Sequence, residues 1–261
     1  SRQLIRGERP QLLLEADASD PAAVSYAVSA FSSLASTALN RDLKGTLSDL
    51  RTNEAPFEPV IHRKFNPEIN TQANTVPALM GVILTMTMVF ITALAITREK
   101  ERGTMENLLA TPLKPTEVMA GKIVPYIAIG IVQVTLVLLL AEFLFKLHVN
   151  GSILLLYFVS IFFIATNLSV GITFSSLAKN QLQAVQMSVF FFLPSIILSG
   201  FMFPFRGMPE WAQAIGSVLP LTHYLVIIRG IMLKGNGFAE IQSHFTAILI
   251  FFAAVLVLGI L

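Results

Sequence analysis

The sequence predicts an all-α polytopic membrane protein with a small α/β domain at its N-terminal end. The 261 residues are 54% hydrophobic and only 13% charged, about half the charged share of an ordinary soluble domain. The mean hydropathy is +0.70, so a water-soluble fold of this size would expose more apolar surface than it could bury. A disordered chain needs the opposite composition. The bilayer is therefore the expected surrounding medium.

The composition also excludes several kinds of site. The chain has no cysteine, which rules out disulfide bonds, a thiol nucleophile, and zinc–thiolate or iron–sulfur centres. Its four histidines show no metal-ligand spacing. A formal net charge of +2 is too small to indicate a nucleic-acid partner. We therefore expect neither a metal nor a cofactor in this chain.

The charged residues are clustered, and the clusters predict the domain organisation. Residues 1–74 contain eight Lys or Arg and nine Asp or Glu, and residues 98–122 contain five and four. The other 162 residues share five basic and three acidic side chains. This distribution predicts a polar domain over residues 1–74 and a transmembrane domain over residues 75–261. The second cluster is then a charged loop inside the transmembrane domain.

The polar domain has the pattern of a strand, a helix and a second strand. Residues 11–15 form the first candidate strand. Asp20 then supplies an N-cap, Pro21 fits the first helical position, and apolar residues recur at helical spacing from Val24. Residues 60–65 are the second candidate strand. A β-α-β unit this small cannot build a full core alone, so we expect partner strands elsewhere in the protein.

Five apolar runs are long enough to cross the membrane. The first, residues 75–97, has 23 residues without a charge and as a helix would be roughly 34 Å long, against a hydrocarbon core of about 30 Å. The sequence begins with a serine and stops inside its last apolar run. We therefore expect a piece of a longer protein, the C-terminal two-thirds or so, with a sixth span before residue 1. The other four runs are residues 123–145, 152–178, 185–203 and 244–261.

The short loops predict the orientation of these spans. Residues 98–122 and 179–184 would lie on one side of the membrane and carry six Lys or Arg in 31 residues. Residues 146–151 and 204–243 would lie on the other side and carry four in 46. Cytoplasmic loops carry the excess of basic residues. We therefore expect the charged loop in the cytoplasm and residues 1–74 outside it.

The segment of residues 204–243 is too polar and too rich in proline to be one ordinary span. Pro209 at a helix start, followed by Trp211, predicts a short interfacial helix with the tryptophan at headgroup depth. The apolar stretch of residues 219–233 contains a proline, a histidine and an arginine. We expect this stretch to enter the outer leaflet and return.

The charged loop of residues 98–122 has the most informative pattern in the chain. Residues 104–110 can form about two helical turns, Pro112 would end them, and Pro115 can begin the next helix. A solvated loop that follows the positive-inside rule is one interpretation. Topology needs only the basic residues, however, so the four acidic ones favour docking to another protein.

Two patterns resemble those of one known family. The first is Arg98-Glu99-x-Glu101-Arg102-Gly103-Thr104-x-Glu106, followed by Pro112. It resembles the coupling segment of type-2 ABC transporter permeases. A second pattern resembles the region between the last two spans of these permeases, and the likeness, over residues 60–261, is greatest to the efflux-associated branch with an extracytoplasmic domain. The second pattern comprises Ser199-Gly200-Phe201, Pro204, Met208-Pro209-x-Trp211, Pro220-Leu221-Thr222-His223 and Arg229-Gly230-x-x-Leu233-Lys234-Gly235.

The resemblance implies the permease subunit of an ATP-driven exporter in a bacterial inner membrane, not an enzyme. Such a subunit has six helices, pairs with a second copy or a homologue, and moves an amphipathic, drug-like or lipid-like substrate out of the cytoplasm. Separate ABC ATPase subunits would bind ATP and magnesium, and the extracytoplasmic domain could dock a periplasmic adaptor. The chain itself has no G-x-x-x-x-G-K-[ST] phosphate loop, since Gly121-Lys122 is followed by Ile123.

The resemblance also assigns roles to particular residues. Glycine in the coupling segment would let the chain turn after the first span, and the charged residues around it would contact the ATPase. The residues expected to couple to the ATPase are Arg98, Glu99, Glu101, Arg102, Gly103, Thr104 and Glu106. The residues expected in an outer gate are Pro204, Pro209, Trp211, Pro220, His223 and Arg229.

Three polar residues of the spans, Gln133, Glu142 and Asn167, are candidate pathway residues. Glu142 is the only charge inside a predicted span, and such a residue is a functional candidate. It could carry a proton or cation, which would make the protein an ion-coupled transporter or channel. The interpretation that its position favours is that it snorkels to the interface and pairs with Lys146 at i+4.

Asn167 shares one helical face with Ser160, Gly171 and Ser175. A face of small and hydroxyl residues suits close packing between membrane helices, and it could also form a substrate surface. An intramembrane enzyme is a further alternative. It finds no support, because the spans contain no G-x-S-x-G, no H-E-x-x-H and no paired aspartates.

Overall fold

The computed structural model describes residues 11–18, 21–37, 57–66, 70–103 and 115–260. It divides into two compact units, Ser1–Thr71 and Gln72–Leu261, called here the N-terminal unit and the transmembrane unit. The predicted fold class is confirmed. Among the described residues, five helices are long and apolar enough to cross a membrane, and the N-terminal unit contains a pair of strands.

The N-terminal unit consists of a strand, a helix and a strand: β1 (Gln11–Asp17), α2 (Pro21–Thr37) and β2 (Glu58–Lys64). The two strands pair in parallel, with Leu14 opposite Ile61. Parallel neighbours need a crossover connection, and α2 lies in it, so the predicted β-α-β order is confirmed. Leu12 and Leu13 of β1 are 45% and 61% exposed, which fits a sheet too small to build its own core.

An ion pair joins the two strands. Lys64 Nζ donates a hydrogen bond to Glu15 Oε2 at 2.6 Å. This hydrogen bond and the positive charge of the ammonium group lower the pKa of the Glu15 carboxyl below its usual value. Because both side chains are about half exposed, water screens the pair and it contributes little to the free energy of unfolding.

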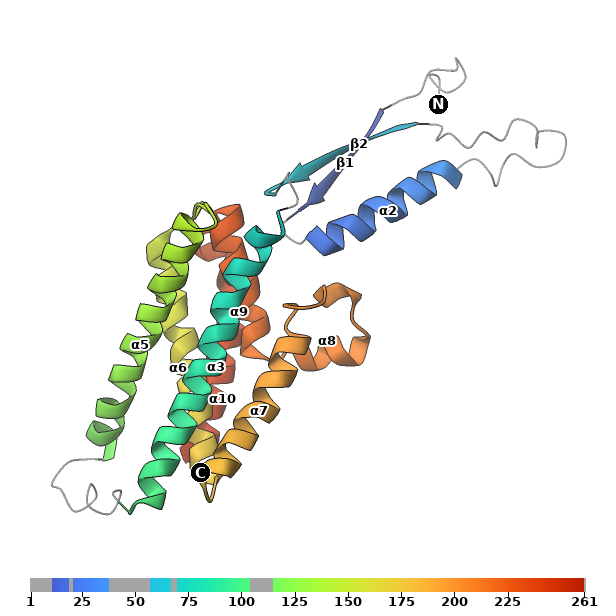
Figure 1. Cartoon of the computed structure of the whole chain (residues 1–261). Coiled ribbons are helices and arrows are strands. Elements are labelled where there is room, and N and C mark those ends of the chain that lie inside the picture. The colour runs from blue at the N-terminus through green and yellow to red at the C-terminus, as the bar shows by residue number, and fades with distance from the viewer. Residues whose placement is uncertain (1–10, 19–20, 38–56, 67–69, 104–114, 261) are drawn as a thin grey trace. The chain divides into compact units, whose positions relative to one another are not determined.

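Five long helices run along one another in the transmembrane unit (Figure 1): α3 (Thr71–Glu101), α5 (Pro115–Phe143), α6 (Ile153–Leu177), α7 (Gln181–Leu198) and α10 (Phe238–Ile260). Helix α6 packs against α5, α7 and α10. Between α7 and α10 the chain forms α8 (Glu210–Gly216) and α9 (Pro220–Arg229), and α9 continues into a π-helical turn, Gly230–Lys234. The axis of α8 is bent by 84° from that of α9 and the turn.

Several helix ends differ from the predicted spans because polar residues act as caps. Helix α7 begins at Gln181 rather than at residue 185, since the Asn180 side chain accepts a hydrogen bond from Gln183 N at 2.8 Å. It ends at Leu198 rather than at residue 203, and Gly200 then adopts a φ of +84°. Helices α3 and α10 also begin earlier than predicted, at residues 71 and 238, and α5 ends earlier, at residue 143.

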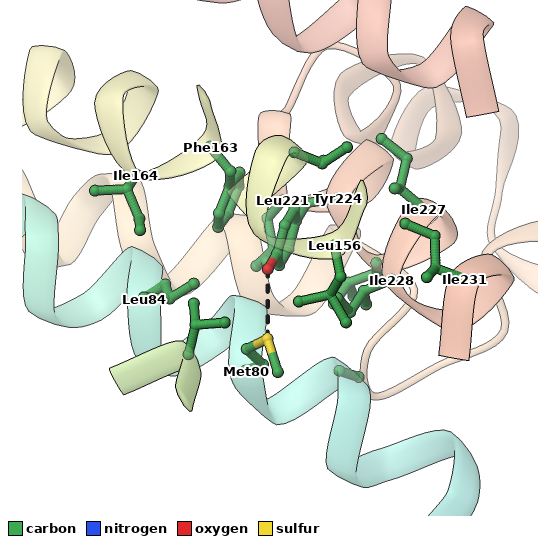
Figure 2. Close-up of a cluster of buried hydrophobic side chains, with 14 of the residues drawn as sticks. Met80, Leu84, Leu156, Phe163, Ile164, Leu221, Tyr224, Ile227, Ile228 and Ile231 are labelled. Atoms are coloured by element: carbon green, nitrogen blue, oxygen red, sulfur yellow. Dashed lines mark hydrogen bonds between the residues drawn. The ribbon is translucent and has the colours of Figure 1, made fainter. Parts of the chain in front are cut away.

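The core of the transmembrane unit lies where α3, α6 and α9 meet (Figure 2). Tyr224 of α9 is fully buried and stacks on Phe163 of α6, with the ring centroids 3.9 Å apart and the ring planes 5° apart. Its hydroxyl lies 2.8 Å from Ser160 Oγ of α6 and 3.5 Å from Met80 Sδ of α3. A buried tyrosine hydroxyl needs such partners. One side chain therefore links three helices.

Glycines let α3 approach both neighbours closely. A Cβ atom on Gly81 of α3 would lie 2.9 Å from Tyr224 Cδ1. A Cβ atom on Gly171 of α6 would lie 2.8 Å from both Val89 O and Thr92 Cβ of α3. Small residues at such contacts are typical of membrane helix interfaces, where packing and hydrogen bonds hold the helices together. Both glycines are therefore required by the packing of α3.

The packing at Gly171 gives a stability prediction. Gly171→Ala would place a methyl group against the backbone oxygen of Val89, which cannot rotate away. We expect a loss of about 1–3 kcal/mol in the free energy of unfolding, the usual result of overpacking, measured as a lower midpoint of thermal unfolding in detergent. The matched control is Gly121→Ala on α5, where no atom lies within 4 Å. Equal midpoints for the two variants would contradict the close contact.

Candidate functional site

The coupling segment begins in the last turn of α3. Arg102 N donates to Arg98 O and Gly103 N donates to Lys100 O, both at 3.1 Å. Gly103 has a φ of +69°, a conformation that glycine adopts without strain. The predicted turn at Gly103 therefore ends α3.

Glu101 binds the first residue of α7. Its carboxylate accepts a hydrogen bond from Gln181 N at 2.7 Å and a second from Gln181 Nε2. The first N–H groups of a helix have no partner within the helix, and a negative charge at this end is favourable. Glu101 therefore acts as a cap for α7, a role that its place in the coupling segment did not indicate.

Lys100 binds the last turn of α6. Its Nζ donates to Ser175 O at 2.7 Å and to Ser176 O at 3.3 Å. These are carbonyl groups at the end of a helix, where a positive charge is favourable. One turn earlier on α3, Thr97 Oγ1 donates to Ser175 Oγ at 3.3 Å. The last two turns of α3 are thus bonded to the end of α6.

We call the junction of α6 and α7 the α6–α7 hairpin, defined as residues 175–183. Sequence reasoning missed Lys100 and Gln181 as members of this site. One signal could have found them. The last turn of α6 has no basic residue and the first turn of α7 has no acidic residue, so each helix end favours a charge from another part of the chain.

The other residues of the predicted coupling segment divide into three groups. Arg98 and Arg102 are exposed, and Glu99 is half-buried at the end of α3. Thr104 and Glu106 lie outside the described residues. The structure thus leaves two arginines on the surface beside the charged residues that hold the α6–α7 hairpin.

The bend between α8 and α9 is built by the residues expected in the outer gate. Pro209 is the N-cap of α8, and Trp211 on that helix is 65% exposed. Pro220 is the first residue of α9. At the bend, Gly216 O accepts hydrogen bonds from Leu219 N at 3.1 Å and from Thr222 Oγ1 at 2.6 Å, so the side chain of α9 joins the backbone of the turn in holding the end of α8.

Arg229 joins three segments of the transmembrane unit. Its Nε donates to Asn74 O in the first turn of α3 at 3.4 Å, and its Nη1 donates to Gly200 O after α7 at 3.3 Å. Pro204, the last residue of the predicted gate, is half-buried and accepts a hydrogen bond from Gly207 N at 2.9 Å. Arg229 therefore ties α9 to the ends of two long helices.

His223 forms a pair with His244 of α10, a residue that sequence reasoning did not select. The two Nδ1 atoms are 3.0 Å apart, and His223 Nε2 lies 2.8 Å from Ser217 O. A carbonyl oxygen only accepts, so Nε2 of His223 carries the proton. In the neutral pair, His223 Nδ1 then accepts from His244 Nδ1–H. The pair connects α9 to α10.

The candidate pathway residues lie in separate contacts. Gln133 Oε1 of α5 accepts a hydrogen bond from Thr87 Oγ1 of α3 at 2.9 Å. The expected helical pair of Glu142 with Lys146 is wrong, because α5 ends at residue 143 and Lys146 adopts a φ of +53°. Glu142 is exposed, and its Oε1 lies 3.4 Å from His148 Nε2.

The face of α6 that contains Asn167 is buried. Ser160, Asn167, Gly171 and Ser175 are all buried, and Gly171 and Ser175 contact α3. Asn167 Nδ2 donates to Phe163 O at 2.9 Å, and its Oδ1 is a buried atom without a hydrogen-bond partner. The contacts of Gly171 and Ser175 show that close packing occurs on this face. In the described part of the chain, no group of three or more His, Asp or Glu could hold a metal ion.

Comparison with known proteins identifies the family of this chain. The family described as "ABC-2 family transporter protein" matches residues 1–261. The chain belongs to this family. The resemblance to type-2 ABC permeases, drawn from the charged segment and the region after α7, is therefore confirmed. No solved structure gives a significant match.

Several curated relatives of this ABC-2 chain are themselves described as permeases. It is 34% identical over 189 residues to "Probable multidrug ABC transporter permease YbhS" of Escherichia coli K12, covering 70% of this chain and 50% of the relative. It is 32% identical over 177 residues to "Probable multidrug ABC transporter permease YbhR", covering 68% and 48%. "Inner membrane transport permease YhhJ" is 28% identical over 221 residues, covering 81% and 57%. The chain thus spans about half the length of these relatives.

The histidine pair gives a prediction about tautomers. When both imidazole rings are neutral, we expect His223 as the Nε2–H tautomer and His244 as the Nδ1–H tautomer. Only this combination gives Ser217 O a donor and places one proton between the two Nδ1 atoms. Nitrogen chemical shifts of histidine-labelled protein measure this directly. His223→Gln assigns one signal and His244→Gln the other. An Nδ1–H tautomer at His223 would contradict the contact with Ser217.

Proposed function

We propose that this chain is part of the membrane-spanning permease subunit of an ABC exporter. The subunit moves an amphipathic, drug-like or lipid-like substrate out of the cytoplasm. A separate ABC ATPase binds ATP with magnesium and hydrolyses it, and two permease copies or homologues form the pathway. The observation that carries the proposal is the family match over residues 1–261. The description of two relatives as multidrug permeases supports the substrate class.

The proposed orientation follows from the charges. The charged loop lies in the cytoplasm of a bacterial cell, and residues 1–74 lie on the outer side of the inner membrane, where a periplasmic adaptor could dock. The excess of basic residues in residues 98–122 supports this orientation. One relative is described as an inner membrane permease, which supports the location.

In this proposal the end of α3 receives the movement of the ATPase. ATP binding brings the ATPase subunits together, and they push on the coupling segment. Arg98 and Arg102 are exposed at the end of α3, where they can bind acidic residues of a partner. Exposed charges of this kind set partner choice and the rate of association.

Capture of the ATPase tests this proposal. In the complete permease, we expect Arg102→Glu to weaken co-purification of the ATPase by about tenfold, the cost of reversing a charge at a complementary interface. The matched control is Arg206→Glu, an exposed arginine in the turn before α8, which should leave capture unchanged. If no ATPase co-purifies with the native permease under gentle conditions, the proposed function is wrong.

The ion-coupled alternative has its own test at Glu142. This residue is exposed in the last turn of α5 and lies beside His148, so the proposed ATP-driven mechanism does not use it. Glu142→Gln should leave ATP-dependent efflux of an amphipathic dye within about twofold of native, as for most surface changes. Loss of dye efflux with unchanged ATP hydrolysis would favour ion coupling instead.

A further inference from the structure

We propose that Lys100 and Glu101 deliver the movement of the coupling segment to the α6–α7 hairpin. The proposal rests on the proposed function, in which an ATPase pushes on the end of α3. It gives these two neighbours a role distinct from docking: they act as positioning residues that make α7 follow α3.

The first argument is the pairing of charge with helix end. Lys100 donates to two carbonyl groups of the last turn of α6, and Glu101 accepts from the first N–H group of α7. Each charge has the sign that its helix end favours. The end turns of the two helices contain neither charge, so α3 supplies these two charges in addition to the cap that Asn180 provides for α7.

The second argument is the small size of the apolar contact at this place. The apolar cluster under the hairpin consists of three buried alanines, Ala93 of α3, Ala178 of the turn and Ala184 of α7, with Phe174 and Met187 packed against them. Alanines bury little apolar surface. The hydrogen bonds of Lys100, Glu101 and Thr97 therefore fix where the hairpin sits on α3, and water screens the charges of the two exposed side chains.

The third argument is position along the chain. Gly103, which ends α3, follows Glu101 by two residues and has a φ of +69°. Lys100 and Glu101 are thus the last charged side chains of α3 bonded to the bundle before the chain turns. A push on the coupling segment reaches them before it reaches the buried part of α3.

Helix α7 can carry the movement onward to the bend between α8 and α9. A Cβ atom on Gly216 of α8 would lie only 2.4 Å from Leu198 O at the end of α7, so the backbones of α7 and α8 are in close contact there. Arg229 of α9 also binds Gly200 O just after α7. Helix α7 thus has contacts at both ends, and contiguous packing of this kind is the route by which displacement travels between sites.

The test uses the complete permease in complex with its ATPase, with an environment-sensitive dye on Ile215→Cys of α8. Ile215 is 50% exposed and residues 1–261 contain no cysteine; any cysteine elsewhere in the complete permease is first replaced by serine. ATP with vanadate should shift the dye emission in the otherwise native complex. In Lys100→Ala with Glu101→Ala, we expect the shift to fall by about tenfold, because both charged contacts are lost, while the ATPase still co-purifies.

Two further variants make the result specific. Lys179→Ala removes an exposed lysine of the hairpin turn and should leave the shift unchanged. Glu101→Gln keeps an acceptor for Gln181 N but removes the charge, so an intermediate shift is expected even if the double variant does not fold. A native-sized shift in the double variant or in Glu101→Gln overturns the proposal. Loss of ATPase co-purification in the double variant or in Glu101→Gln also overturns the proposal, because Lys100 and Glu101 would then act in docking the ATPase. Absence of ATPase from the native complex instead refutes the proposed function.

Discussion

The close approach of α3 to α6 is the contact on which the rest of the transmembrane unit depends. Gly171 of α6 lies against Val89 and Thr92 of α3, and farther along both helices Ser175 meets Thr97. The paired residue numbers rise together, so the two helices run parallel. Apolar burial alone does not hold helices together in a bilayer, where the lipid is equally apolar. The backbone contact at Gly171 and the hydrogen bonds from Thr97 and Lys100 to the last turn of α6 supply the attraction instead.

The same constraint explains the ends and breaks of the helices. Polar groups that lose water need protein partners. Lys100 and Glu101 add to the caps of the α6–α7 hairpin, Thr222 adds a donor to the bend before α9, and Arg229 donates to carbonyl groups near α3 and α7. Each of these contacts joins segments that are distant in sequence. The residues that satisfy the backbone are therefore also the residues that connect one helix to the next.

Much of the fold could be predicted from the sequence, because the bilayer fixes the length and composition of a span. The β-α-β order was also predictable, from a capping residue and a proline. Helix ends were less predictable. Polar residues such as Gln181 and Gln183 do not count toward an apolar run. They are nevertheless part of α7, because Asn180 is the N-cap of this helix. The turn after α5 has neither glycine nor proline within residues 144–146, which is why a helical pair was expected at Glu142. Partners of the site residues, such as Gln181 for Glu101 and His244 for His223, depend on tertiary packing that no local pattern encodes.

The most direct test of this account is disulfide crosslinking between α3 and α6. Residues 1–261 contain no cysteine, so Thr97→Cys with Ser175→Cys introduces the only two thiols of this segment, at side chains whose oxygens are 3.3 Å apart. The control is Thr97→Cys with Thr173→Cys, since Thr173 faces Gly259 of α10 instead. The account predicts rapid crosslinking within the chain for the first pair and little for the second. Equal or reversed crosslinking would contradict the register of α3 on α6, and with it the connection from the coupling segment to the bundle.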